Sequence, residues 1–416
     1  MKKSRQLIII YFLILFLGSG CGKIEATVEI KDNLSFKVYN KIKLSDLIKV
    51  NDGFISDDKE IFLDKIGDNS ISINYQDYRK HKSNVKVNFR VYDDVAPFLS
   101  MSNNVYKEIN SDFDLCDSAF YGDNYDRNVA CVINGEYDKE KTGAYKLKMT
   151  VRDESGNESE KDFTLHLIEK FNTSNNNSTP TGLDFKDAIT KYKNDETMLG
   201  IDVSSFQGEI NWEKVKNTGV EFAIIRLGFG YTVNNELVLD KYFKENLQHA
   251  KEQGLKVGVY FYTYANTLEE IEEQAKFIVK NLDGVDLELG VAFDWENWNN
   301  FQDYHVSFYD LDNMYNNFST LLKEKGYDAM LYGSKFYLSN VWNTENKNVW
   351  LAHYTGMTNY DKDYKIWQFS DKGLVDGISG FVDLDVLYKW LFNILNSYTT
   401  LKFKNLFYIE KLNKVL

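Results

Sequence analysis

Apolar and polar residues alternate with a period of two through the first part of the chain. Runs such as "ATVEI", "VKVNFRVYDD" and "AYKLKMTV" show this alternation, and turn-forming residues separate them. A period of two is typical of β-strands that bury one face, because successive side chains point to opposite sides. The pattern therefore predicts an all-β region over residues 26–169.

Part of this β region is repeated. Residues 66–97 and 142–169 share the same order of a glycine turn, a strand, a polar turn and a second strand. Such self-similarity indicates repeated modules. The second copy contains "DESGN" at 153–157, and it resembles the end of a bacterial Ig-like domain. The resemblance implies two Ig-like sandwiches, over 26–95 and 96–169, and leaves open whether they are spacers or bind a ligand.

From residue 196 the pattern changes to short apolar runs that alternate with stretches of helical period. Four such pairs follow one another, from "MLGIDVSS" to "VAFDWEN", and four further apolar runs come with little helix between them. Repeated strand–helix units predict a parallel sheet, and eight strands in so short a segment predict a TIM-like β/α barrel with incomplete helices over 196–390. The polar stretch 170–195 is predicted to be a linker, and residues 391–416 a C-terminal extension.

The N-terminal segment predicts export. A basic start, "MKKSRQ", precedes the apolar run "LIIIYFLILFLG", which is shorter than the ~20 residues of a membrane span. Small residues then lead to Cys21. The segment resembles a lipoprotein signal peptide over 1–20, although Gly18 stands where leucine is usual, and the resemblance implies a lipid on Cys21. An ordinary cleaved signal peptide, which implies secretion, and an uncleaved anchor are the alternatives.

The remaining cysteines are interpreted in the light of export. The chain has 3 cysteines, so Cys116 and Cys131 remain if Cys21 carries a lipid. Disulfides persist in exported proteins, and the two are predicted to pair, with two free thiols as the alternative.

Charge and motifs exclude several classes of function. The net charge is −13, whereas proteins that bind nucleic acid carry basic faces. The 5 histidines are scattered without the spacing of metal ligands, and neither a Walker A nor a G-x-S-x-G motif occurs. We therefore predict no nucleic-acid partner, no metal and no cofactor.

Carboxylates gather at the ends of the predicted barrel strands. They are Asp202 on the first strand, Asp294 and Glu296 on the fourth, and Asp383 and Asp385 on the last. Because residues i and i+2 of a strand share a face, Asp294 and Glu296 point the same way at the barrel mouth, and Trp295 points to the other face. Two carboxyls so close disfavour simultaneous ionisation, so that one holds a proton near neutral pH. An acid beside an anion is what glycoside hydrolysis requires, although an isolated D-x-E is more often a solvated turn.

The motifs of the barrel resemble those of one enzyme family. They are, in order, "GIDVSSFQG", "AIIRLGFG", "VGVYFYTYA", "VAFDWEN", "LYGS", "VWLAHYT", "IWQFS" and "VDLDVLY". Over residues 199–388 this series resembles the glycoside hydrolase family 25 muramidases. The resemblance implies a β/α barrel that cleaves the β-1,4 bond between N-acetylmuramic acid and N-acetylglucosamine, with peptidoglycan glycan strands as its partner.

The resemblance also assigns roles to individual residues. Glu296 matches the general acid, and Asp294 matches the acid that stabilises an intermediate formed by the sugar's N-acetyl group. Asp202 and Asp383 match the aspartates of the first and last strands, with Asp385 as a second choice. The family's stereochemistry, inverting or retaining, stays open.

Further residues are candidates for binding the substrate. Arg226, Tyr262, Tyr332 and Gln368 match positions that line the family's groove, and the aromatic residues Trp295 and Tyr354 at strand ends suit stacking on sugar rings. The sequence thus predicts a lipid-anchored muramidase at the outer face of a bacterial membrane. The alternative is an inactive lipoprotein that only binds peptidoglycan, against which the presence of all four acids argues.

Overall fold

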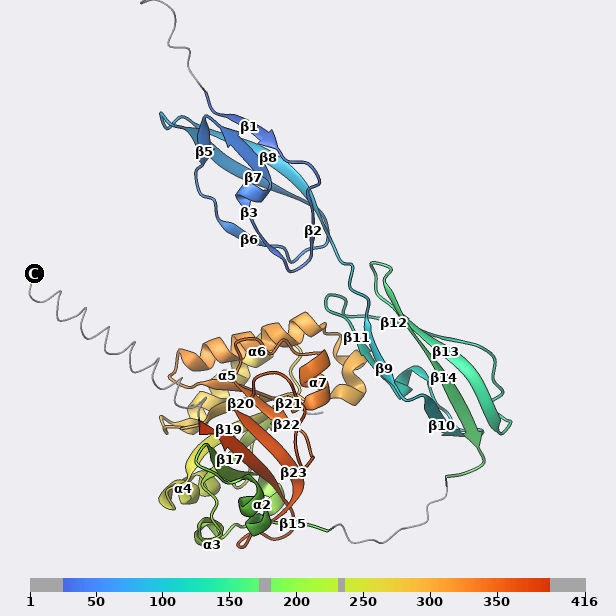
Figure 1. The fold of residues 1–416 in the computed structure, drawn as a ribbon, viewed down its shortest axis with the longest axis vertical. Helices are drawn as coiled ribbons and strands as arrows, with labels where there is room; N and C mark the ends of the chain where they lie inside the picture. Colours follow the sequence, from blue (N-terminus) through green and yellow to red (C-terminus); the bar gives the residue numbers. More distant parts are fainter. Residues whose placement is uncertain (1–24, 172–180, 231–235, 390–416) are drawn as a thin grey trace, which may run out of the picture. The chain divides into compact units, whose positions relative to one another are not determined.

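The computed structural model describes residues 25–171, 181–230 and 236–389, and the chain divides into two compact units, Met1–Val95 and Ala96–Leu416 (Figure 1). The predicted signal peptide, Cys21 and the C-terminal extension lie outside the described residues. Within the described ranges, no helix combines the length and the apolar character that crossing a membrane requires.

The first unit consists mainly of strands. They are β1 (Thr27–Ile30), β2 (Ser35–Lys37), β3 (Lys41–Lys43), β4 (Ile48–Asn51), β5 (Gly53–Ile55), β6 (Glu60–Phe62), β7 (Gly67–Asp77) and β8 (Lys82–Tyr92), with a short helix η1 (Leu44–Asp46). The largest sheet has the order β2-β8-β7-β5, in which β7 and β8 form an antiparallel hairpin and β2 is parallel to β8. Alternate hairpin residues such as Ile73, Val87 and Val91 are buried, as the period of two predicts.

The second unit begins with a further region of strands, residues 96–169, which we call the β-module. Its elements are β9 (Phe98–Met101), β10 (Asn104–Glu108), η2 (Cys116–Ser118), β11 (Ala119–Gly122), β12 (Ala130–Asn134), β13 (Gly143–Arg152) and β14 (Glu158–Ile168). The sheet order β10-β14-β13-β12, with β10 parallel to β14, repeats the pattern of the first unit. Strands β9 and β11 pair separately, and a disulfide joins Cys116 to Cys131.

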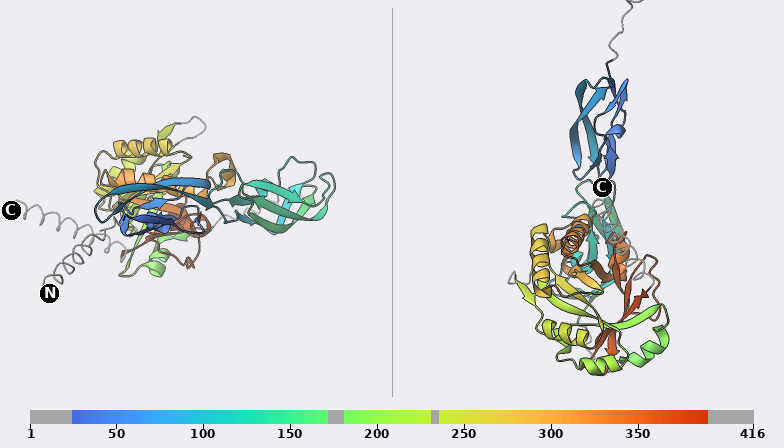
Figure 2. Two further views of the ribbon diagram at one scale, coloured as in Figure 1. Left: turned by 90° about the horizontal axis from the view of Figure 1, so that it is seen from above. Right: turned by 90° about the vertical axis from the view of Figure 1, so that its left-hand side faces the viewer.

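Eight strands of the second unit close into a barrel. They are β16 (Thr197–Val203), β17 (Phe222–Gly230), β19 (Lys256–Thr263), β20 (Gly290–Asp294), β21 (Ala329–Ser334), β22 (Val349–Ala352), β23 (Ile366–Leu374) and β24 (Val382–Tyr388). The first seven are parallel to their neighbours. Strand β24 is antiparallel to both β23 and β16, and it closes the barrel beside the first strand (Figure 2).

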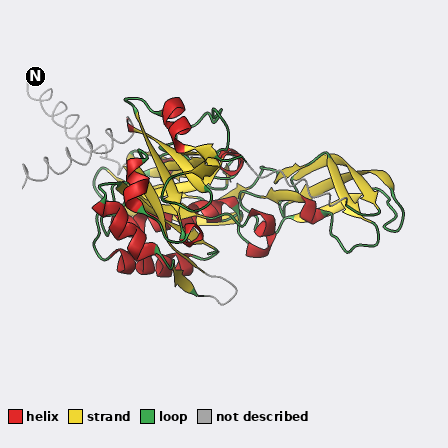
Figure 3. Ribbon diagram, turned by 90° about the horizontal axis from the view of Figure 1, so that it is seen from below, coloured by secondary structure: helices red, strands yellow, loops and turns green. Residues whose placement is uncertain are grey.

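Helices surround this barrel unevenly (Figure 3). They are α3 (Trp212–Asn217), α4 (Phe243–Glu252), α5 (Leu268–Leu282), α6 (Phe308–Lys323) and α7 (Lys335–Asn340), with η3 (Ser205–Gln207) and η4 (Trp298–Tyr304) in the loops. The connections 353–365 and 375–381, which the structure describes throughout, contain no helix. The outer layer is therefore incomplete beside the last strands, as the sequence predicts.

Each barrel strand divides its residues between two cores. Outward residues such as Ile201, Ile225 and Phe293 pack beneath the helices. Inward residues such as Phe222 and Ala292 form a smaller core inside the barrel. Burial on both faces explains why the strands appear in the sequence as nearly continuous apolar runs.

One prediction about this region was wrong. The predicted linker 170–195 was too long, because β15 (Leu183–Asp184) pairs with β23 and α2 (Phe185–Tyr192) packs on the barrel. Phe185 and Ala188, three residues apart on one face of α2, are buried in the core beneath the helices. The parallel sheet predicted from the strand–helix units is confirmed for β16, β17, β19 and β20. Strand β24 runs in the opposite direction.

The role of α2 is testable by truncation of its buried side chain. Phe185→Ala should lower the free energy of unfolding of the barrel by about 3–5 kcal/mol, the usual loss for a buried phenylalanine. Chemical denaturation of the purified chain measures this change. Lys186→Ala, on the exposed face of the same helix, is the matched control. Equal stabilities of the two variants would contradict the docking of α2.

Candidate active site

A pocket of about 280 Å³ opens at the barrel end where the parallel strands finish. Its lining includes the acids Asp202, Asp294, Glu296 and Asp383, together with Ser204, Phe206, Gln207, Arg226, Tyr260, Tyr262, Tyr332, Trp350, Tyr354 and Gln368. The structure thus brings together the four predicted catalytic acids, and five of the six predicted substrate-binding residues lie beside them.

The inward residues of the strands explain why polar groups meet here. In β16 the inward series runs from Met198 to Asp202, and in β17 it runs from Phe222 to Arg226. Each series is apolar at the bottom of the barrel and polar at the mouth. In β24 the series is reversed, with Asp383 first and the buried Leu387 last. Since β24 is antiparallel, its beginning lies at the mouth, and Asp383 is the register partner of Asp202.

Asp294 and Glu296 form a coupled pair. Asp294 ends β20, where Tyr262 of β19 and Tyr332 of β21 are its register partners, and it is only 4% exposed. One carboxylate oxygen, Oδ1, is buried without a hydrogen-bond partner. Burial raises the pKa of Asp294 well above its usual value, and the neighbouring charge of Glu296 raises it further. Burial also raises the pKa of Glu296. The pair therefore holds a shared proton more readily than two exposed carboxyls would.

A hydrogen-bond network orients Asp202. The Gln368 side-chain nitrogen donates to Asp202 Oδ2 at 2.7 Å. The Gln368 oxygen in turn accepts from the hydroxyls of Tyr332 and Tyr354, each at 3.0 Å. The two tyrosine hydroxyls fix the orientation of the Gln368 side-chain amide, so that its nitrogen points toward the Asp202 carboxyl. Burial, followed by the charge of Asp385, raises the pKa of Asp202 well above its usual value.

The two aspartates of β24 have different surroundings. Asp383 lines the pocket, and burial together with the charge of Asp202 raises the pKa of Asp383 to about 9. Asp385, two residues after Asp383 on the same face of β24, is fully buried, and Trp350 Nε1 donates to its Oδ1 at 2.8 Å. Asp383 is therefore the acid of β24 that a substrate can contact, and Asp385 lies buried beneath the pocket, outside its lining.

Arg226 is held by residues that the sequence analysis missed. Its Nε donates to Asp240 Oδ2 at 2.8 Å, and a terminal nitrogen donates to Ser205 Oγ at 2.8 Å. Asp240 also accepts from the backbone N–H of Ser205 at 3.0 Å. Asp240 follows β18 (Leu237–Leu239), which pairs back onto β17. Only that hairpin brings Asp240 to Arg226, and no motif signals it.

One predicted substrate-binding residue lies elsewhere. Trp295 is fully buried in the core beneath the helices, where its Nε1 donates to the backbone oxygen of Ala265 at 3.1 Å. Its position between two inward acids directs its ring outward. Its prediction as a sugar-binding residue was therefore wrong. Phe206, which is 85% exposed at the pocket edge, offers an accessible aromatic face instead.

The pocket continues into a wider groove of about 610 Å³. Glu296, Tyr332 and Tyr354 line both, and α7 contributes Lys335 and Phe336 to the groove wall. Glu296 thus lies where the pocket and the groove meet. Such a site suits a bond inside a long polymer, because each side of the junction can hold one part of the chain.

The arrangement is suited to acid–base chemistry on a neutral, hydroxyl-rich substrate. Carboxyls with raised pKa values can donate protons near neutral pH, and aromatic walls exclude water. Asp123 and Asp153 of the β-module, whose carboxylate oxygens lie within 4.8 Å of each other, are acids that could contribute to a metal site, and they lie outside this pocket.

Comparisons with known proteins agree with this geometry. Residues 201–378 match the model of the family described as glycosyl hydrolases family 25. The autolytic lysozyme of Clostridium acetobutylicum is 32% identical over 191 residues, which are 45% of this chain and 55% of that protein. Lysozyme M1 of Streptomyces globisporus is 27% identical over 202 residues, which are 44% of this chain and 65% of that protein.

A solved structure was also found to be similar. The crystal structure of the bacterial lysozyme from Streptomyces coelicolor aligns with a TM-score of 0.39 at 25% identity, over 46% of this chain and 92% of that chain. The chain spans little more than half the length of the Clostridium acetobutylicum relative.

The raised pKa of Asp383 predicts how stability depends on pH. The folded state binds this proton up to about pH 9, whereas an unfolded aspartate releases it near pH ~3.9. The free energy of unfolding should therefore fall as the pH rises through this window. Asp383→Asn should raise the melting temperature at pH 8 and leave it unchanged at pH 3. Calorimetry tests this, with the exposed Asp361→Asn as control. A parallel pH dependence in wild type and Asp383→Asn would contradict it.

Proposed function

We propose that this chain, whose residues 201–378 form a glycosyl hydrolase family 25 domain, hydrolyses the β-1,4 bond between N-acetylmuramic acid and N-acetylglucosamine in peptidoglycan. The observation that carries the proposal is the meeting of four acids from β16, β24 and the end of β20 in one aromatic-walled pocket. Glycoside hydrolysis needs a protonated carboxyl for the leaving oxygen and an anion for the developing cation.

Glu296 is the general acid in this proposal. It lines both the pocket and the groove, so it can reach a glycosidic oxygen that lies at their junction. Burial raises its pKa above the usual value for a glutamic acid, which favours the protonated form that a general acid needs. Asp294, behind it, stabilises the intermediate formed by the N-acetyl group of the sugar. Shared titration lets one member of the pair carry the proton while the other is anionic.

The remaining residues hold and orient the glycan. Asp202, fixed by Gln368, and Asp383 face the sugar from the opposite side of the barrel mouth. Phe206 and Tyr354, with 85% and 52% of their surfaces exposed, provide faces for sugar rings.

We propose further that the enzyme is exported and tethered to the outer face of the membrane by a lipid on Cys21. The two repeated β regions are proposed to be Ig-like sandwiches. The main sheet of each region has the same order, in which its earliest strand in the sequence (β2 or β10) runs parallel to its latest (β8 or β14). This shared order supports the interpretation. In this arrangement the enzyme acts on the wall of the cell that produces it.

The assignment of the acid is tested by Glu296→Gln. Loss of the general acid should lower the rate of glycan cleavage by about 10²–10⁴-fold while binding to insoluble peptidoglycan persists. Digested peptidoglycan is reduced and analysed by mass spectrometry, and binding is measured by co-sedimentation. Glu269→Gln, exposed on α5, is the matched control and should behave as wild type.

The products also decide between alternatives. Reduced N-acetylmuramic acid at the new ends supports a muramidase, whereas reduced N-acetylglucosamine ends would identify a glucosaminidase. A wild-type chain that binds peptidoglycan but releases no fragments would favour the inactive binding protein. Undiminished cleavage by Glu296→Gln would refute the role of this acid.

The proposed tether has its own test. Cys21→Ser should move the protein from the membrane fraction to the medium, because no lipid can be attached, and activity on isolated walls should be unchanged. Fractionation of producing cells, followed by immunoblotting, measures the distribution. Cys21→Ser protein that stays in the membrane fraction would argue for an uncleaved anchor instead.

A further inference from the structure

The β-module contacts the barrel through an aromatic cluster centred on one side chain. Phe120 of β11 packs edge-on against Trp298 and Phe301 of η4, with ring centroids 5.8 and 5.5 Å away. It also packs edge-on against Tyr337 of α7 at 5.1 Å. Phe336 of α7 lies 6.2 Å from Phe120. Phe120 therefore contacts both η4 and α7.

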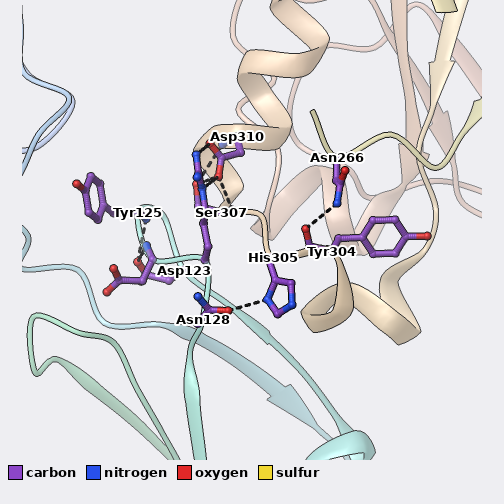
Figure 4. Close-up of polar contacts among 10 residues, drawn as sticks. Asp123, Tyr125, Asn128, Asn266, Tyr304, His305, Ser307 and Asp310 are labelled. Carbon is purple, nitrogen blue, oxygen red and sulfur yellow. Dashed lines mark hydrogen bonds and ion pairs between the residues drawn. The ribbon is translucent and has the colours of Figure 1, made fainter. Parts of the chain in front are cut away.

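Polar contacts also join the β-module to the barrel, among them the hydrogen bond between Asn128 and His305 (Figure 4). His305 Nδ1 lies 2.7 Å from the Asn128 side-chain oxygen, which accepts its hydrogen. Beside them Arg127 contacts both carboxylate oxygens of Asp310, at 2.8 and 3.0 Å. Bidentate contacts of this kind fix the relative orientation of the two side chains as well as their distance.

Hydrogen bonds to the backbone of β11 and the loop after it bring the β-module into close contact with the barrel. The Gln302 side chain donates to the Tyr121 backbone oxygen at 2.6 Å, and the Phe308 N–H donates to the Asp123 oxygen at 2.8 Å. A Cβ atom on Gly122 would lie 2.6 Å from the Phe308 ring and 2.7 Å from the Phe301 ring. Strand β11 is thus in direct contact with the barrel's aromatic side chains, and any larger residue at 122 must displace them.

The segment that the module contacts is the one that carries Glu296. The Trp298 N–H donates to the Glu296 backbone oxygen at 2.8 Å, and the Trp298 ring packs 4.6 Å from that of Trp295. Farther along, the Tyr304 backbone oxygen accepts from Asn266 at 3.1 Å (Figure 4). The Glu296 backbone is therefore hydrogen-bonded to Trp298, the first residue of η4, and Trp298 packs against Trp295 on the other side of Glu296 in the sequence.

Trp298 also links this segment to the groove. Its ring stacks on Tyr337 of α7 at 3.9 Å with an interplanar angle of 13°. Helix α7 supplies Lys335 and Phe336 to the wall of the groove that Glu296 lines. One side chain of the β-module, Phe120, thus contacts both α7, which lines the groove, and η4, which follows Glu296 in the chain.

We propose that the β-module is a structural part of the active site, and that Phe120 is a positioning residue that holds η4 and α7 so that Glu296 is correctly oriented. The inference rests on the proposed function for the role of Glu296. In this inference the β-module helps to position a catalytic group, which a passive spacer does not do. Displacement of a catalytic group by about 1 Å can lower a rate by ~100-fold, so small shifts of η4 suffice.

The test is Phe120→Ala in the full chain, purified in detergent. We expect kcat for peptidoglycan cleavage to fall by about 10- to 100-fold with a much smaller change in KM. Looser packing admits water to Glu296 and lowers its raised pKa, so the alkaline limb of the kcat–pH profile should move to lower pH. Phe120→Leu should restore part of kcat. Tyr106→Ala, which removes an exposed ring from β10, should match wild type.

A second variant separates positioning from a folding defect. Gly122→Val keeps Phe120 but displaces Phe301 and Phe308, and it should lower kcat and move the pH profile in the same way. Thermal unfolding confirms that each variant is folded. A folded Phe120→Ala and a folded Gly122→Val with wild-type kcat and pH profile would overturn the inference without affecting the proposed function.

Hydrogen exchange decides the inference even if the proposed function fails. If the wild-type chain releases no fragments, the muramidase proposal is lost. Exchange of the amides in 296–304 should still be faster in Phe120→Ala than in Tyr106→Ala. Equal exchange in this segment would show that the β-module does not hold it.

Discussion

The burial of several carboxyl groups in one pocket is the constraint on which the rest of the structure depends. Asp202, Asp294 and Asp385 are almost inaccessible to solvent, and burial raises the pKa of each well above the usual value. Burying such groups costs free energy unless they are neutral or hydrogen-bonded. The barrel meets this cost with protons, with the Gln368 amide and with the Trp350 indole, and it obtains acids whose pKa values lie above their usual range.

The barrel is able to hold these groups because its remaining volume is densely apolar. Inward residues fill the barrel below the pocket, and outward residues of the same strands pack under the helices. Strands buried on both faces have little freedom to shift. A rigid frame of this kind keeps pairs such as Asp202 and Asp383 at facing positions on neighbouring strands, although charges on both would repel each other. The surrounding core thus stabilises the site in addition to the site's own hydrogen bonds.

The aromatic residues of η4 and α7 give the β-module its place in the second unit. The segment after β20 carries Trp298 and Phe301, and Phe120 of β11 covers both. The segment that follows Glu296 is therefore supported from outside the barrel. This arrangement couples a β region remote in the sequence to the groove without any direct contact with the substrate.

The sequence by itself determined the elements and much of the chemistry. The periods of two and 3.6 predicted the strands and helices, because burial of a face imposes those periods. The spacing of Asp294 and Glu296 predicted their shared face, and the same alternation placed Trp295 on the other. The order of acids and apolar residues in "VDLDVLY" is the reverse of that in "MLGID", and this reversal indicates the direction of β24.

Only the tertiary structure decided which residues meet across long separations. Asp240 reaches Arg226 through a hairpin, α2 packs on the barrel beyond a polar stretch, and Phe120 contacts Trp298 from a separate region. Local patterns report which face of an element is buried, but not against what it is buried. Pairings between distant segments depend on how the faces of many elements fit together, and no single stretch of the chain encodes that fit.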